Sequence, residues 1–144
     1  NIMSLLDEEN FATKTDLPNS NYVFYCLFYG NANLTDASGL LLPAETLAKY
    51  CYAYMFLGCT ALTAAPELPA TTLADHCYYY MFAVCSKLAS VTCKATDISA
   101  EGCLYNWLYN AGTDATSPTL YVDPTMTGAN WNNGGFAVTA IPGN

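Results

Sequence analysis

A segment of 26 residues occurs twice in succession, as LPAETLAKYCYAYMFLGCTALTAAPE from Leu42 to Glu67 and as LPATTLADHCYYYMFAVCSKLASVTC from Leu68 to Cys93. The residues that recur with the same identity are Leu42, Pro43, Ala44, Thr46, Leu47, Ala48, Cys51, Tyr52, Tyr54, Met55, Phe56, Cys59 and Leu62. Agreement at this density is self-similarity rather than composition bias. A fixed period between about 20 and 50 residues is typical of repeat proteins. The sequence therefore predicts stacked, repeated units.

Length and charge narrow the functions that need to be considered. The chain has 144 residues, 53% of them hydrophobic, which suits a single domain with a substantial core. The formal net charge of −8 disfavours nucleic acid and anionic lipid as partners, because both require clustered Lys and Arg. No apolar run is long enough to span a membrane. Since the chain begins at Asn1 without a signal peptide, we interpret it as a piece of a longer precursor whose signal or anchor lies elsewhere.

Cysteine is frequent but its spacing favours neither a metal site nor disulfides. The seven residues are Cys26, Cys51, Cys59, Cys77, Cys85, Cys93 and Cys103. No Cys-x-x-Cys pair occurs, and the single histidine cannot complete a His-rich site, so no metal and no cofactor is predicted. Equivalent cysteines of stacked helices would lie about 8–10 Å apart, farther than the 7 Å or so that a disulfide tolerates. The cysteines are predicted to be small buried hydrophobic residues.

Each repeat is predicted to contain one helix and one short strand. Leu73, Cys77, Tyr80, Met81 and Val84 follow the spacing of an amphipathic helix. Phe82 falls on the opposite side of that helix, which we interpret as a tightening near its end. The strands are predicted at 62–65 and 88–93, parallel and side by side. Their inward residues would be Leu62, Ala65, Leu88, Val91 and Cys93.

Weaker repeats flank the two full ones. Val23 aligns with Cys51 and Phe28 with Phe56 at an interval of 28 residues, and Cys103 and Trp107 align with Cys77 and Met81. A last strand is predicted at 119–122. The domain organisation is therefore a single domain over 1–144. It has an N-terminal cap at 1–22 with a turn at 17–20, about four repeats at 23–122, and a C-terminal cap or tail at 123–144 anchored by Trp131 and Phe136.

The unit Phe-x-x-Cys-x-x-Leu, at Phe56, Cys59 and Leu62 and again at Phe82, Cys85 and Leu88, resembles the BspA-like leucine-rich repeats. The resemblance covers about residues 1–122 and includes Leu-Pro-Ala-Thr-Thr-Leu-Ala, Tyr-Met-Phe and the opening Asn-Ile-Met-Ser-Leu-Leu. It implies an α/β fold, a short right-handed solenoid in which each repeat supplies one helix and one parallel strand. It also implies an extracellular or cell-surface bacterial setting and an adhesion role directed at host matrix or cell-surface proteins.

No catalytic constellation is present, and we predict that the chain is not an enzyme. Nucleophile-elbow, phosphate-loop and His-Glu-x-x-His motifs are all missing. His76 is not preserved in the repeat, and its neighbour Cys77 would point about 100° away on a helix. The acidic residues that could act as a pair are Glu45, Glu67, Asp75, Asp97 and Glu101. All but Glu67 lie near predicted helix starts, where the helix dipole explains them.

Tyrosine is the remaining surface signal, with 12 residues in the chain. Tyr54 and Tyr80 lie on the apolar stripe and are predicted to be core, whereas the candidates for ligand contact are Tyr52, Tyr78, Tyr79 and Tyr121. The leading hypothesis is a non-enzymatic module that binds a protein, since aromatic residues are enriched at interfaces. The alternatives are a carbohydrate-binding module that uses a tyrosine patch to bind a polysaccharide, and a structural spacer within a larger surface protein.

Overall fold

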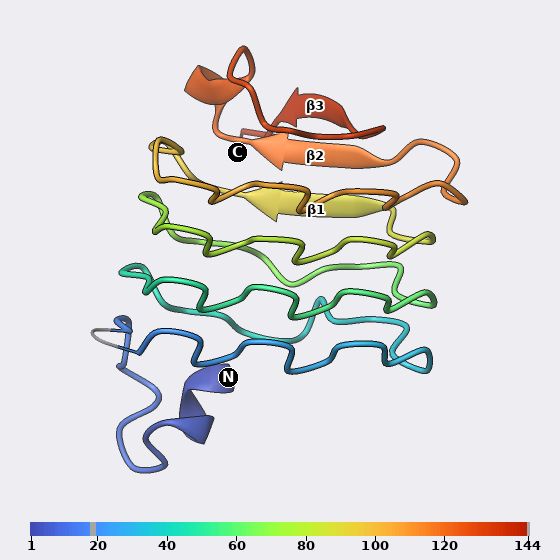
Figure 1. Cartoon of the computed structure of the whole chain (residues 1–144). Helices are drawn as coiled ribbons and strands as arrows, with labels where there is room; N and C mark the ends of the chain where they lie inside the picture. Colours follow the sequence, from blue (N-terminus) through green and yellow to red (C-terminus); the bar gives the residue numbers. More distant parts are fainter. Residues whose placement is uncertain (18–19, 144) are drawn as a thin grey trace.

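The computed structural model describes residues 1–17 and 20–143, so the turn predicted at Pro18 and Asn19 lies outside the described residues. Its elements are a 3-10 helix η1 (Ile2–Leu5), strands β1 (Ser90–Cys93) and β2 (Thr119–Val122), a 3-10 helix η2 (Pro124–Met126) and strand β3 (Ala137–Ala140). Within the described residues there is no α-helix. The repeats lie one above another as layers, with the two ends of the chain at opposite ends of the stack (Figure 1).

One side of the stack consists of four segments of consecutive turns, which we call turn runs. They cover residues 21–30, 49–58, 75–84 and 101–110. Their backbone N–H groups alternate between two partners. In the second run the N–H of Ala53 donates to the carbonyl of Tyr50, three residues earlier, whereas the N–H of Tyr54 donates to the carbonyl of Tyr79 in the next run. The first pattern closes a β-turn and the second joins neighbouring layers. Local turns and layer-to-layer bonds together pair the backbone without an α-helix.

The turn runs have a period of four residues. Every fourth residue has a positive φ, namely Tyr22, Cys26 and Gly30, then Tyr50, Tyr54 and Gly58, then His76, Tyr80 and Val84, and finally Gly102, Asn106 and Asn110. A right-handed helix cannot contain such residues at regular intervals, because it requires a negative φ throughout. The side chains at these positions face outward. The two residues that follow each of Tyr50 and His76 face the core.

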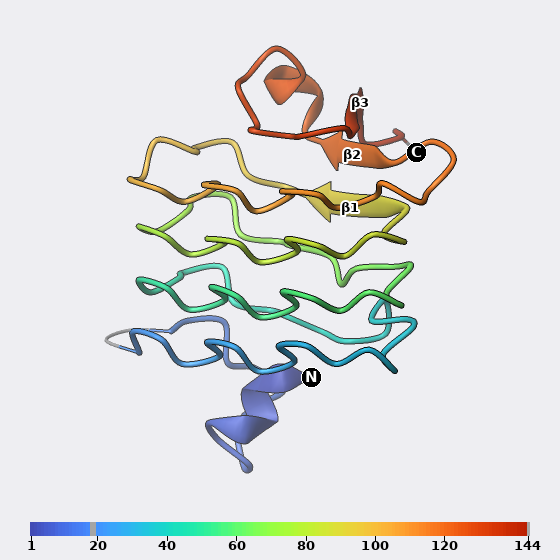
Figure 2. The same cartoon turned by 45° about the vertical axis from the view of Figure 1, so that its right-hand side comes forward.

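The side of the stack opposite the turn runs holds a parallel sheet in the order β1-β2-β3. Ser90 pairs with Thr119, and Thr119 pairs with Ala137. Isolated bridges extend the same row of pairs downward, from Ser90 to Ala64 and from Ala64 to Asp36. In both views β1, β2 and β3 follow one another along the axis of the stack, toward its C-terminal end (Figures 1 and 2). The core fills the space between the two sides.

Columns of aromatic rings form that core. Phe28, Phe56 and Phe82 are stacked with 5.3 Å between successive ring centroids. A second column runs from Phe24 through Tyr52, Tyr78 and Trp107 to Trp131, with ring centroids 5.8–6.4 Å apart. Offset stacking of this kind adds about 0.5–1.5 kcal/mol per pair to the burial of apolar area.

The predicted fold class is wrong. The chain is not an α/β leucine-rich-repeat solenoid with a helix and a strand in each repeat. Phe82 shows the reason: it lies 0% exposed in the core four residues after Tyr78, at the period of the turn run, rather than on a tightened helix end. A period of four satisfies the same i, i+4 spacings as an α-helix over one or two turns. The predicted repeat alignment itself agrees with the hydrogen bonds, because Tyr52 donates to Cys77 and Tyr78 to Cys103.

The predicted strands agree with the structure more closely than the predicted helices do. The strand predicted at 119–122 is β2, its predicted parallel pairing with the preceding strand is confirmed, and 88–93 shortens to β1. The strand predicted at 62–65 is reduced to the bridges of Ala64. Strand β3 was not predicted; it adds residues from the C-terminal tail to the sheet.

The cysteines were correctly predicted to be buried, but the distance assumed between successive layers was wrong. Six of the seven are buried and Cys26 is partly buried, and all are free thiols. Cys59 and Cys85 donate to the carbonyls of Phe28 and Phe56 in the layer before. Since successive layers share backbone hydrogen bonds, they lie at about the 4.8 Å separation of β-strands rather than at the 8–10 Å of packed helices.

The C-terminal segment closes one end of the core through its two predicted anchors. Trp131 is 0% exposed and Phe136 is 2% exposed. The indole N–H of Trp131 donates to Met126, and that of Trp107 donates to the carbonyl of Trp131, both at 2.8 Å. Residues 124–136 are thereby fixed over the fourth turn run. None of the helices in the described part of the chain has the length and apolar character needed to cross a membrane.

Candidate functional site

A continuous surface of eight aromatic rings covers part of the turn-run side of the molecule. We call it the tyrosine surface. It comprises Tyr22 and Tyr25 from the first turn run, Tyr50 and Tyr54 from the second, His76, Tyr79 and Tyr80 from the third, and Tyr105 from the fourth. Each ring contacts at least one other member, so the rings form one network across four layers.

Three stacks run along the axis of the layers. Tyr22, Tyr50 and His76 form the first, with ring centroids 4.7 and 4.6 Å apart and ring planes within 8° of parallel. Gly102 ends this stack, because a Cβ atom at Gly102 would lie 2.6 Å from the imidazole ring of His76. Tyr54 and Tyr80 form the second stack at 5.3 Å, and Tyr79 and Tyr105 form the third at 5.4 Å.

Tyr79 joins the three stacks. Its ring meets Tyr50, Tyr54, His76 and Tyr80 edge-on, at interplanar angles between 62° and 74°. Alternating stacked and edge-on contacts are the two arrangements that aromatic pairs prefer. The side chains are therefore held in place by one another before any ligand arrives.

The interior of the tyrosine surface presents ring edges and hydroxyl groups rather than ring faces. Within each stack the faces that lie between two rings are covered by those rings. Desolvation by neighbouring groups raises the pKa of Tyr54 to about 12. The same cause, followed by the charges of Tyr22, Tyr79, Glu101 and Asp75, raises the pKa of Tyr50 above its usual value. Tyrosine hydroxyls are protonated near neutral pH in any case, and these two stay protonated further into the alkaline range, so that they can donate as well as accept hydrogen bonds.

Polar residues border this surface on two sides. Lys49 and Asp75 form an exposed ion pair with an N–O distance of 3.9 Å, and Asp75 also accepts from the backbone N–H of Glu101. On the other side the amide of Asn106 donates to the hydroxyl of Tyr80 at 3.1 Å. An aromatic centre with a polar border is the usual anatomy of a protein interface.

The four predicted contact residues lie in different places. Tyr52 and Tyr78 are each 1% exposed and belong to the core column, so neither presents its ring to a ligand. Tyr79 is partly buried at the centre of the tyrosine surface, and Tyr121 is partly buried on β2, across the core from it. Tyr54 and Tyr80, predicted to be core, lie on the outside instead. The helical period thus placed Tyr52 and Tyr78 on the surface and Tyr54 and Tyr80 in the core, which is the reverse of their positions in the structure.

The sequence prediction missed most of the tyrosine surface, in particular Tyr22, Tyr25, Tyr50, Tyr105 and His76. A usable signal was present, because the outward positions share their columns with residues that favour a positive φ. Gly102 follows His76 after 26 residues, and Asn106 follows Tyr80 at the same interval. Glycine and asparagine at a four-residue spacing, Gly102, Asn106 and Asn110, indicate recurring left-handed positions rather than a helix.

Three of the five acidic residues considered as catalytic candidates, Glu67, Asp75 and Asp97, have structural contacts that do not involve helix starts. Glu67 pairs with Lys94 at 2.9 Å, and Asp97 accepts from both the N–H and the hydroxyl of Ser99. The hydrogen bonds from Ser99 lower the pKa of Asp97. The described residues contain no group of three or more His, Cys, Asp or Glu that could hold a metal ion.

Comparison with known proteins identifies no relative: no family model, no curated protein and no solved structure matches this chain.

Proposed function

We propose that this chain is a non-enzymatic binding module that recognises a protein partner through the tyrosine surface. The observation that carries the proposal is the pre-ordered network of eight rings with exposed edges and hydroxyls. Tyrosine offers a large contact area at low cost in conformational entropy, and here mutual stacking removes part of that cost in the free protein.

The geometry favours a protein over a polysaccharide. Sugars bind aromatic side chains by stacking on an exposed ring face, and the faces in the interior of this network are occupied by neighbouring rings. Ring edges and hydroxyls suit the mixed apolar and hydrogen-bonded contacts of a protein interface. The setting that we propose, a secreted or cell-surface protein of a bacterium, rests on the sequence resemblance alone. The excess of acidic residues supports a partner other than nucleic acid.

A binding array tests the proposal. Purified protein is applied to immobilised extracellular matrix proteins and, in parallel, to purified polysaccharides. The test variant is Tyr22→Ala/Tyr105→Ala, which removes rings that are 53% and 51% exposed at the two ends of the network. The matched control is Tyr29→Ala/Leu41→Ala, which removes side chains that are 59% and 58% exposed outside it. We expect binding to a protein on the array to weaken at least about tenfold in the test variant and to be unchanged in the control.

The other outcomes contradict the proposal in different ways. Selective loss of polysaccharide binding would support the carbohydrate alternative. Equal binding by both variants would place the site elsewhere. An array without any bound protein would favour the spacer hypothesis.

A further inference from the structure

The ladder of hydrogen bonds between turn runs has an unfinished end at the fourth run. In the second and third turn runs, the backbone N–H groups of the residues with positive φ donate to carbonyl groups of the next run. Examples are the bonds from Tyr54 to Tyr79 at 2.9 Å and from Val84 to Tyr109 at 2.8 Å. No fifth turn run exists in the described chain. The N–H groups of Asn106 and Asn110, which occupy the equivalent positions, have no hydrogen-bond partner among the described residues.

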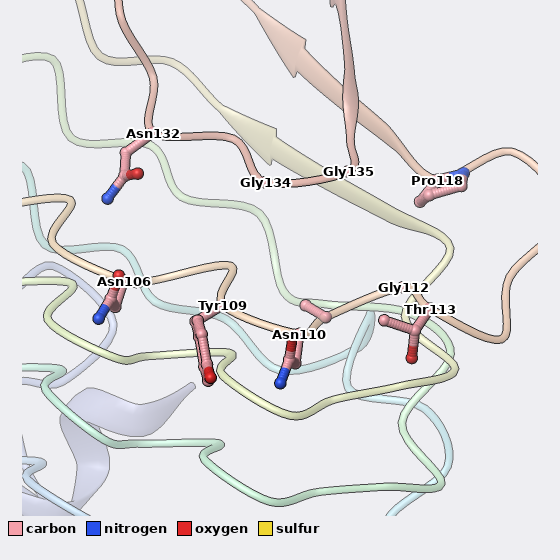
Figure 3. A pocket seen from close by; sticks show the side chains of 10 residues that line it. Asn106, Tyr109, Asn110, Gly112, Thr113, Pro118, Asn132, Gly134 and Gly135 are labelled. Atoms are coloured by element: carbon pink, nitrogen blue, oxygen red, sulfur yellow. The ribbon is translucent and has the colours of Figure 1, made fainter.

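A pocket of about 290 Å³ lies at this end. One wall is the fourth turn run from Asn106 to Thr113, and the other is formed by Asn132, Gly134 and Gly135 of the C-terminal segment. Figure 3 shows that the side chains of Asn106, Tyr109 and Asn110 lie on the side of the run away from the two glycines. The walls that face each other across the pocket are therefore mainly backbone.

Several backbone N–H groups that line the pocket have no acceptor in the part of the chain that the structure describes. Besides Asn106 and Asn110, the N–H groups of Gly134 and Gly135 have no partner within the described part of the chain. The hydroxyl of Thr113 likewise has no partner among the described residues. A ligand that fits this pocket must bring hydrogen-bond acceptors.

Charge selects among the possible acceptors. The lining contains no Lys, Arg, Asp or Glu, and the chain as a whole carries −8. A phosphate or other multiply charged anion would find no counter-charge there. Main-chain carbonyl groups are neutral acceptors, and the lower layers already show them bound to this row of donors, since Tyr80 donates to Tyr105 and Val84 to Tyr109.

We propose that this pocket binds a peptide segment of another protein through the main-chain carbonyl groups of that peptide. The peptide lies between the fourth turn run and Gly134 and Gly135, in the part of the next layer that the C-terminal segment leaves open. Its carbonyls accept from Asn106 and Asn110. The site is separate from the tyrosine surface. Recognition by backbone hydrogen bonds of this kind is a common way to add a segment to an existing ladder.

A display selection with two glycine variants tests this proposal. Random twelve-residue peptides are selected on the native protein, and the enriched peptide is synthesised with a free and with an amidated C-terminus. Gly135→Leu places a side chain in the pocket, and Gly128→Leu is its control, because a Cβ atom at either glycine meets no other atom within 4 Å. We expect Gly135→Leu to weaken binding at least about tenfold and Gly128→Leu to leave it unchanged.

Hydrogen exchange gives the second readout. Peptide binding should slow exchange of the Asn106 and Asn110 amide protons at least about tenfold, as expected for newly hydrogen-bonded groups. The proposal is overturned if no peptide is enriched, if Gly135→Leu binds as well as the native protein, or if exchange at Asn106 and Asn110 is unaffected. Binding that requires the free C-terminus would show that a carboxylate, rather than main-chain carbonyls, occupies the site.

Discussion

Backbone conformation at single residues decides the shape of the turn runs. The column of Gly30, Gly58, Val84 and Asn110 illustrates this, because all four have a positive φ. Glycine and asparagine adopt this conformation readily, whereas a β-branched residue is strained in it. The backbone of Val84 is therefore strained, whereas the equivalent residue of the preceding repeat, Gly58, adopts the same conformation without strain.

Replacing Val84 with glycine should relieve this strain. Because Val84 is 39% exposed, it also loses little packing when truncated. We expect Val84→Gly to raise the free energy of unfolding by about 1 kcal/mol, measured by urea denaturation. Thr60→Gly, at an exposed residue without a positive φ, should lower it instead. Stabilisation by both substitutions, or by neither, would contradict the assignment of strain to Val84.

The same conformation explains why individual side chains were misplaced by the sequence analysis. Tyrosine is not recognised as a residue of positive φ, so Tyr50 and Tyr54 gave no sign that the chain turns there. Glycine and asparagine in the equivalent columns carry that information most clearly. The exposed position of Tyr54 and the burial of Tyr52 follow from the turn geometry, which side-chain hydrophobicity alone does not reveal.

At the scale of the element, the turn run and the helix compete for the same sequence. Cys77 and Met81 are four residues apart, as on one face of a helix, and the helix propensity of the residues around them does not exclude a helix. What favours the turn run is the hydrogen bonding between layers, as from Phe56 to Met81 and from Phe82 to Trp107 at 2.9 Å each. These are tertiary contacts, so a single segment does not reveal them. The repeat and its register could be predicted because they are properties of the whole sequence.

The stack that ends at Gly102 offers a test of how neighbouring runs fit together. Gly102→Ala should destabilise the protein by about 1–3 kcal/mol, because φ is +61° and the added Cβ atom would lie 2.6 Å from the His76 ring. In a His76→Ala background the collision with the ring is gone, and the cost should be smaller by about 1 kcal/mol. Urea denaturation of the four proteins measures this coupling. An equal cost in both backgrounds would mean that the backbone conformation alone requires glycine.

At the scale of the whole molecule, the stack depends on keeping its thiols protonated. Burial raises the pKa of Cys51, Cys85 and Cys93 from the usual 9.0 to about 12 in each case. Above pH 9 the unfolded chain loses these protons while the folded chain retains them. The folded state thus binds more protons, and stability must fall as the pH rises through this window.

We expect the free energy of unfolding to be insensitive to thiol ionisation below about pH 9 and to decline between about pH 9 and pH 12. Urea denaturation at several pH values measures the slope. In Cys85→Ala the slope should be shallower, because one buried thiol no longer contributes. A slope that is identical in Cys85→Ala would show that this thiol is not what makes the stack sensitive to alkali.

The column of rings from Phe24 to Trp131 should direct excitation energy toward the C-terminal end of the molecule. Tyr52 and Tyr78 lie within contact distance of each other, Tyr78 faces Trp107, and Trp107 adjoins Trp131 with 6.4 Å between ring centroids. Tyrosine passes its excitation to tryptophan readily over such short separations, and both tryptophans sit at the C-terminal end. Light absorbed in the middle of the stack is therefore emitted from that end, and a loosening of the segment around Trp131 will change the fluorescence of the whole chain.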